Sequence, residues 1–108
     1  MRVLLLALGI ATAPPVGPLP KGPTIHVATK VGKTFVVTLP KRAGLDWRIA
    51  QRFDARVVRE VAEGDRGATV WVRFRAVAPG TTRIVFAQTR GETAKAYAAR
   101  TFRVTVRR

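Results

Sequence analysis

The sequence predicts an all-β fold, an antiparallel β-sandwich of about seven strands in one domain. Polar and apolar residues alternate with a period of two in seven short segments, the pattern of strands with one buried and one solvated face. Glycine- and proline-containing turn signals separate these segments, and no segment keeps the 3.6-residue period of a helix. A chain of 108 residues, 47% of them hydrophobic, is long enough to bury one core.

The alternation places each strand in turn. It is clearest in residues 68–76, where Val70, Val72 and Phe74 share one face. Residues 56–62 are β-branched enough for a strand, although a short helix is an alternative there. The expected strands are residues 24–29, 33–39, 46–51, 56–62, 68–76, 82–89 and 100–107.

The two tryptophans have different expected roles. Trp47 falls on the third strand, where sandwiches of the immunoglobulin type bury a tryptophan, so the topology is expected to be immunoglobulin-like. The chain has no cysteine, so its core alone must hold it together. Trp71 lies on the outer face beside Arg73 and Arg75. We expect an arginine to stack on its ring, with anchoring of a partner or dimer as the alternative.

The N-terminus has the pattern of an export signal. Met1 and Arg2 precede an apolar run over residues 3–10, and small residues follow, so residues 1–13 are expected to be a cleaved signal peptide. The run is too short to span a bilayer. Residues 14–23, rich in proline and glycine, are expected to form an extended linker to the domain at 24–108. The protein is therefore expected to be secreted or periplasmic; an irregular N-terminus in a cytosolic protein is the alternative.

The formal charge of +14 predicts attraction to anionic partners. The alternative is that the basic side chains mainly keep the protein soluble. If Arg48, Arg83 and Arg103 all point outward, one sheet carries a basic face for anionic glycan or lipid. Nucleic acid is disfavoured because base-stacking sites need several exposed aromatic residues and an exported protein rarely meets nucleic acid.

Catalysis has little support in the residues. The single histidine, His26, has no acidic neighbour in sequence and is expected to be a surface residue on an edge strand. The carboxylates are scattered among arginines, which lower carboxyl pKa values, whereas glycosidase chemistry needs a raised one. The sequence contains neither the phosphate-binding motif G-x-x-x-x-G-K-[ST] nor the dinucleotide-binding motif G-x-G-x-x-G. With one histidine and no cysteine, it cannot build a multi-histidine or cysteine-based metal site. We expect no enzyme activity, no metal and no cofactor.

Binding is expected at loops that meet at one end of the sandwich. The loop at residues 40–45 and the loop at residues 90–99 share this end in a Greek-key sandwich, and residues 63–67 can join them.

Residues 26–106 resemble the chagasin-like family of inhibitors of papain-type cysteine peptidases. The matching stretches, in chain order, are Val31-Gly32, Leu39-Pro40, Gly44-Leu45-Asp46-Trp47, Phe74-Arg75-Ala76 with Pro79-Gly80, Ile84 with Phe86, and Phe102-Arg103-Val104. The resemblance implies an exported, disulfide-free, immunoglobulin-like domain that inserts loops into a peptidase cleft.

The three loop motifs of that family are altered here. Its N-P-T-T-G loop with a following aromatic corresponds to residues 41–45, its G-x-G-G loop to residues 65–68, and its R-P-W triplet to residues 90–92. The predicted function is inhibition of a cysteine peptidase, or an inhibitor-derived protein-binding module, by a monomer or weak dimer; the alternative is an envelope-associated structural or adhesion module. The predicted partner-binding residues are Lys41, Arg42, Ala43, Gly44, Leu45, Arg66, Gly67, Arg90, Gly91 and Glu92.

Overall fold

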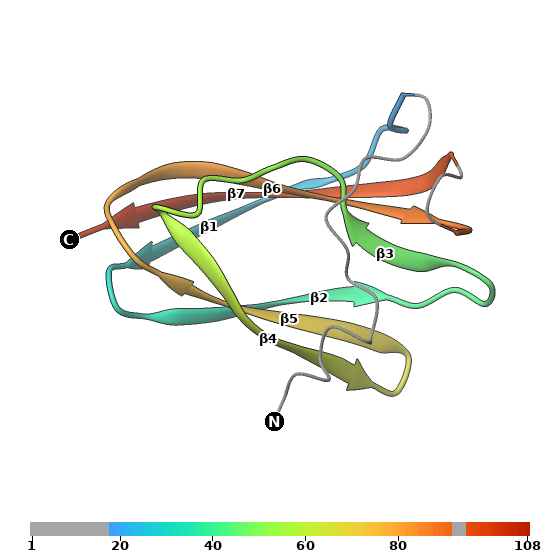
Figure 1. Cartoon of the computed structure of the whole chain (residues 1–108), viewed down its shortest axis with the longest axis horizontal. Coiled ribbons are helices and arrows are strands. Elements are labelled where there is room, and N and C mark those ends of the chain that lie inside the picture. Colours follow the sequence, from blue (N-terminus) through green and yellow to red (C-terminus); the bar gives the residue numbers. More distant parts are fainter. Residues whose placement is uncertain (1–17, 92–94) are drawn as a thin grey trace.

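The computed structural model describes residues 18–91 and 95–108, and every regular element in these ranges is a β-strand (Figure 1). The predicted signal peptide at residues 1–13 and the first part of the predicted linker lie outside the described residues. The strands are β1 (Thr24–Lys30), β2 (Thr34–Pro40), β3 (Asp46–Ile49), β4 (Val58–Arg66), β5 (Thr69–Ala76), β6 (Gly80–Thr89) and β7 (Ala96–Arg107).

The strands form two stacked sheets. One has the order β1-β7-β6-β3 and the other the order β2-β5-β4, and Figure 1 shows them as two layers. All neighbouring strands pair antiparallel except β1 and β7, which run parallel from Thr24 opposite Thr101 to Lys30 opposite Arg107. The predicted immunoglobulin-like all-β sandwich is confirmed, with this one parallel pair as an addition.

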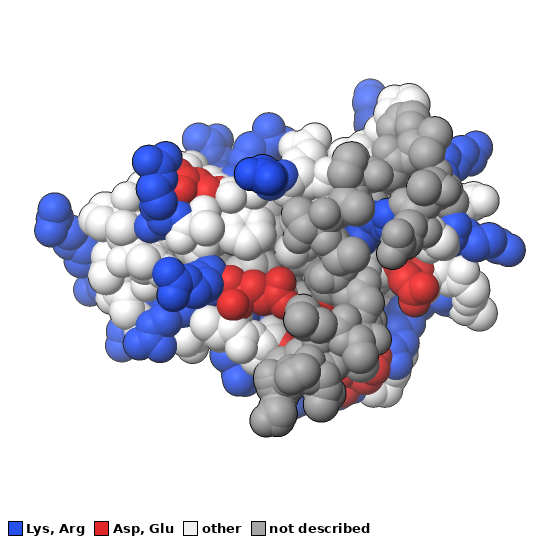
Figure 2. Space-filling model, in the orientation of Figure 1, with Lys and Arg blue, Asp and Glu red and all other residues white. Residues whose placement is uncertain are grey.

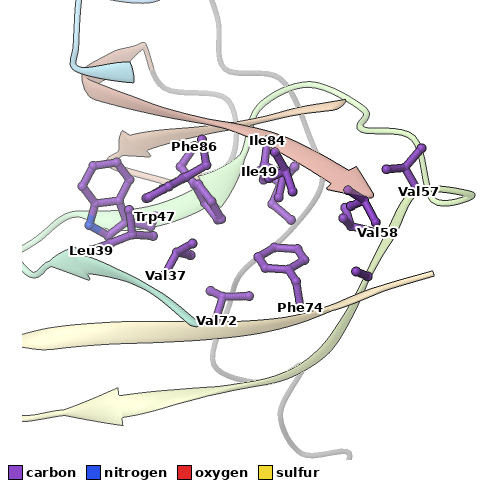
Figure 3. Packing of buried hydrophobic residues seen from close by; sticks show 14 residues of the cluster. Val37, Leu39, Trp47, Ile49, Val57, Val58, Val72, Phe74, Ile84 and Phe86 are labelled. Atoms are coloured by element: carbon purple, nitrogen blue, oxygen red, sulfur yellow. The ribbon is translucent and has the colours of Figure 1, made fainter. Parts of the chain in front are cut away.

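The core lies between the two sheets and is built by the inward-facing half of each alternation (Figure 3). Phe74 from β5 and Phe86 from β6 are fully buried, and the ring of Phe86 meets Phe102 edge-on at 5.8 Å between centroids. Trp47 is buried as predicted. Burial of such side chains contributes about 1.5–3 kcal/mol each, which is why a cysteine-free domain of this size can fold.

Two expected loops are shorter than predicted. Residues 63–66 belong to β4, which stays paired with β5 until Arg66 lies opposite Thr69, so the turn is reduced to Gly67 and Ala68. Gly67 has a φ of 57°, as the first central residue of a type II′ hairpin turn requires. Similarly, β7 begins at Ala96, so the last loop covers residues 90–95. Residues 56–62 contain no helix; residues 55–57 form a turn, and the strand begins at Val58.

The outer face of β6 is covered, which the alternation alone does not predict. Val85 and Ala87 point away from the core, yet both are buried in a second small cluster with Ala50 and Ala96, against which Leu19 packs. The chain before β1 has no regular structure over residues 18–23. It is nevertheless attached to β7, because Thr101 N donates a hydrogen bond to Pro23 O at 3.0 Å.

None of the described residues forms a helix long and apolar enough to cross a membrane.

Candidate functional site

Three connections meet at one end of the sandwich, at the right of Figure 1, and we call them the apical loops: β2–β3 at residues 41–45, β4–β5 at residues 67–68 and β6–β7 at residues 90–95. The structure therefore brings the predicted site residues to the same end, apart from Glu92, which lies outside the described residues.

The first two apical loops are joined directly. Lys41 N donates a hydrogen bond to Ala68 O at 2.8 Å, and Lys41 Nζ lies 2.9 Å from Asp65 Oδ1. The ion pair is partly exposed and contributes little to stability, but the backbone bond fixes the relative position of the two loops. Within the β2–β3 loop, Leu45 N donates to Arg42 O at 3.1 Å, and Gly44 has a φ of 78°, a conformation that favours glycine.

The carbonyl of Pro40 links the base of the loops to the core. It accepts a hydrogen bond from Trp47 Nε1 at 2.7 Å and a second from Gln88 Nε2 at 3.3 Å. Gln88 is fully buried on β6, so this carbonyl ties the ends of β2, β3 and β6 together. The sequence indicated a buried Trp47 but gave no sign of its indole hydrogen bond.

The third apical loop is held by Arg48. A basic face that includes Arg48 requires this side chain to be exposed, but it is only 5% exposed, and its Nη2 donates to Gly91 O. Thr89 Oγ1 donates to the same carbonyl at 2.9 Å. Arg48 does lie on the outer face of β3, but that part of the sheet is covered, so its guanidinium serves the loop rather than the surface.

A cavity of about 290 Å³ opens between the β2–β3 loop and the end of β4. Lys41 and Arg42 are exposed at its rim, Leu45 is half-buried, and Trp47 lies below. Among the other predicted residues, Ala43, Gly44, Arg66, Gly67, Arg90 and Gly91 are all exposed. The described part of the apical surface thus carries more basic than acidic side chains, with Asp46 and Asp65 as the acids that line the cavity.

The carboxylates of β4 depart from the expectation that arginines lower their pKa values. A bulge between Glu60 and Ala62 sets Glu60 opposite Phe74 and Glu63 opposite Val72, so both acids face the interior. Burial raises the pKa of Glu60, and burial together with the charges of Glu60 and Asp65 raises that of Glu63 to about 7. Glu63 is 2% exposed and neither of its oxygens has a hydrogen-bond partner.

Asp54 behaves as the sequence predicts, because hydrogen bonds from Arg56 lower the pKa of its carboxyl group. Neither Glu60 nor Glu63 lines the apical cavity. His26 is exposed on the edge strand β1, as predicted, and lies opposite Arg103. Within residues 18–91 and 95–108, no three acidic or histidine side chains come close enough to hold a metal ion.

Comparison with known proteins supports the fold. The structure is similar to that of the cysteine protease inhibitor EhICP2 from Entamoeba histolytica, with a TM-score of 0.62 and 13% sequence identity over 82% of this chain and 99% of the inhibitor. It is also similar to PbICP-C in its complex with falcipain-2, with a TM-score of 0.64 and 15% identity over 88% of this chain and 98% of the other. No family model and no curated protein matches the sequence. The resemblance to chagasin-like inhibitors is thus confirmed at the level of the fold.

Proposed function

We propose that this chain is an exported inhibitor of papain-type cysteine peptidases that blocks the substrate cleft with its apical loops and performs no chemistry itself. The observation that carries the proposal is the joined set of three apical loops at one end of the fold that EhICP2 and PbICP-C also have. Insertion of loops needs a rigid projecting surface rather than a nucleophile, and this end of the molecule supplies one.

Pre-organisation of the loops supports binding. The bonds from Lys41 to Ala68 and from Arg48 to Gly91 hold the loops before any partner arrives, so little conformational entropy is lost on association. Leu45 is an apolar residue that lines the cavity at this surface. No tryptophan or tyrosine is exposed at the described part of the apical loops, so exposed cationic side chains and the half-buried Leu45 would take the place of a single aromatic anchor.

The charge of the apical loops suggests the kind of target. Lys41, Arg42, Arg66 and Arg90 are exposed there, against two exposed acids, Asp46 and Asp65, of which Asp65 is paired with Lys41. A peptidase whose cleft rim is acidic would be attracted over long range and would associate faster at low salt. We therefore expect inhibition to depend on ionic strength through the association rate.

The test is titration of papain with the purified protein, using a chromogenic substrate to follow residual activity. We expect inhibition at micromolar concentration or below. Arg42→Glu should weaken it about tenfold or more, whereas Lys33→Glu should not, because Lys33 is exposed in the β1–β2 turn at the opposite end. The two variants change the net charge equally. Absence of inhibition, or equal losses in both variants, would contradict the proposal.

Export is part of the proposal and has its own measurement. The apolar run at residues 3–10 and the small residues after it support cleavage near Ala11 or Ala13. Mass spectrometry of the native protein should find an N-terminus after one of these residues. Retention of Met1 would contradict export and leave the inhibition assay unaffected.

A second candidate function is attachment to an anionic lipid or glycan surface through the four-stranded sheet. Arg83 on β6 lies directly opposite Arg103 on β7, and His26 on β1 comes next in the same row; all three are exposed. Like charges placed opposite each other destabilise a sheet unless an anion lies over them. Binding to anionic vesicles should therefore fall with salt and disappear in the Arg83→Glu/Arg103→Glu double variant; unchanged binding would exclude this candidate.

A further inference from the structure

A groove runs along the outer face of the three-stranded sheet, on the side away from the core. Its volume is about 260 Å³, and it extends from the β4–β5 turn along the β2 side of Trp71. The lining residues come from three strands: Val36 and Thr38 from β2, Arg66 from β4, and Thr69, Trp71 and Arg73 from β5.

The indole at the side of this groove is held by its neighbours on the sheet. Trp71 on the central strand lies between Thr38 of β2 and Gly64 of β4. A Cβ atom at position 64 would lie 2.7 Å from Trp71 Cζ2, so only a glycine lets the ring edge rest against β4. The guanidinium carbon of Arg73 lies 5.2 Å from the ring centroid, the predicted cation–π contact. The ring is thus held in place without a ligand.

The acidic side chains of β4 do not neutralise the positive charge on this face. Arg66 and Arg73 line the groove, and Arg59 lies directly opposite Arg75 farther along the same face. The described carboxylates of β4 do not compensate: Glu60 and Glu63 face the interior, and Asp65 pairs with Lys41. Figure 2, which views the two sheets from the side, shows that basic side chains also predominate over acidic ones elsewhere on the surface. A bound anion would relieve this repulsion.

The backbone of Arg66 is held by Thr69, another residue that lines the groove. Thr69 Oγ1 donates a hydrogen bond to Arg66 O at 3.0 Å, which holds the backbone of β4 at the hairpin. Along the sheet, Arg66 lies opposite Thr69, Trp71 opposite Thr38 and Arg73 opposite Val36. The two arginines therefore stand toward the two ends of the groove, with Trp71 and Thr38 between them and Val36 beside Arg73.

We infer that this groove binds a segment of an acidic polysaccharide, with Arg66 and Arg73 on successive carboxylate or sulfate groups. Guanidinium groups bind such planar or tetrahedral anions by paired hydrogen bonds. Sugar rings offer hydroxyl groups to Thr38 and an apolar C–H face to Val36 and the indole. A volume just below the usual range of small-molecule pockets suits a short stretch of chain.

Other polyanions fit this groove less well. Single-stranded nucleic acid needs successive aromatic platforms, and Trp71 is the one aromatic side chain among the residues that line the groove. A lipid bilayer is reached by large protruding apolar side chains, whereas the exposed apolar residue here is Val36.

The experiment is calorimetric titration of the full chain with a heparin-derived hexasaccharide, which carries both sulfate and uronate groups. The decisive pair of variants is Val36→Glu and Val77→Glu. Val36 is 47% exposed in the groove and Val77 is 37% exposed in the β5–β6 connection, so each variant adds one negative charge at an exposed valine. We expect saturable binding that Val36→Glu weakens about tenfold or more and Val77→Glu by less than about twofold.

A second pair keeps the test meaningful if Val36→Glu folds poorly. Arg73→Gln should weaken binding and Arg52→Gln, which removes the same charge from the exposed β3–β4 connection, should not. Indole fluorescence should change on titration, and Trp71→Phe should abolish the change because the remaining Trp47 is buried. Equal losses within either pair, absence of saturable binding, or tighter binding of oligo-dT than of the hexasaccharide would overturn the inference. Papain inhibition measured on Val36→Glu separates this site from the apical loops, since it should be unchanged.

Discussion

Strands β6 and β4 have similar lengths but opposite environments. β6 lies between β7 and β3, and its residues from Ile84 to Thr89 are all buried, on both faces. β4 is the edge of the smaller sheet, and among its nine residues only Val58 and Glu63 are buried. The difference teaches that alternation of polar and apolar residues reports which face points inward, whereas the position of a strand in its sheet decides how much of either face is covered.

The two strands also differ in what they place inside. The inner face of β6 carries apolar Ile84 and Phe86 between the uncharged Thr82 and Gln88. In contrast, β4 turns the carboxyl groups of Glu60 and Glu63 toward the interior. An edge strand can carry inward-pointing acids at the border of the core, and such acids also discourage pairing with another chain. Substitutions in β6 should therefore change stability by altering core packing. Substitutions in β4 should change how stability depends on pH.

The largest expected effect comes from the core side of β6. Phe86→Ala removes a fully buried ring that packs edge-on against Phe102, and it should lower the free energy of unfolding by about 3–5 kcal/mol. Urea denaturation provides the measurement. Val61→Ala, at the exposed bulge of β4, is the matched control and should change stability by less than about 0.5 kcal/mol. Similar losses in the two variants would remove the distinction between the strands.

The next effect is a pH dependence from β4. The pKa of Glu63 is raised to about 7 in the folded protein from its ordinary value of 4.5, so the folded state binds the extra proton between these values. Its contribution to stability is therefore complete below about pH 4.5, falls as pH rises toward 7 and is lost above it. The change amounts to at most about 3 kcal/mol.

Glu63→Gln should flatten this profile and stabilise the protein at pH 8, measured by urea denaturation at pH 5 and pH 8. Asp46→Asn, an exposed carboxyl on β3, is the control and should leave the profile in place. If the stability of Glu63→Gln depends on pH in the same way as that of the unsubstituted protein, a group other than Glu63 takes up the proton on folding.

A smaller effect is expected where β4 supports Trp71. Gly64→Ala would bring a Cβ to 2.7 Å from the indole, so the ring must shift, at a cost of about 1–3 kcal/mol. In a Trp71→Ala background the same substitution should cost much less, because the clash is gone. The coupling energy from this double-mutant cycle, measured by thermal unfolding, should be close to the single-variant cost; independent effects would contradict the contact.

The smallest effect is that of the cation–π pair on the outer face. Arg73→Gln should lower stability by about 0.5–1 kcal/mol, because the guanidinium leaves the indole. Arg75→Gln, two residues along the same face and directly opposite Arg59, should be neutral or slightly stabilising, since it removes a like-charge pair. Urea denaturation at low salt distinguishes the two; a larger loss from Arg75→Gln would reverse the assignment.

Sequence patterning predicted the strands and the gathering of the apical loops because both follow from local alternation and turn residues. Trp47 in the core and the contact of Trp71 with Arg73 were also predictable, since each depends on neighbours along one strand. The burial of Arg48 was not predictable from the sequence, because it depends on a distant segment. The β6–β7 loop places the carbonyl of Gly91 within hydrogen-bonding distance of the Arg48 guanidinium. The inward position of Glu63 was not predictable either, since one bulged residue in β4 changes which side chains face the core.

The parallel pairing of β1 with β7 has a consequence for the order of folding. It joins the first strand of the domain to the last, so its contacts are among the longest in sequence that the chain can make. Chains dominated by such contacts fold slowly, on the scale of about milliseconds to seconds, because the intervening loop must be closed first. A ribosome releases β1 long before β7, so β1 must wait without a partner, and the sheet closes only when the whole domain has left the exit tunnel.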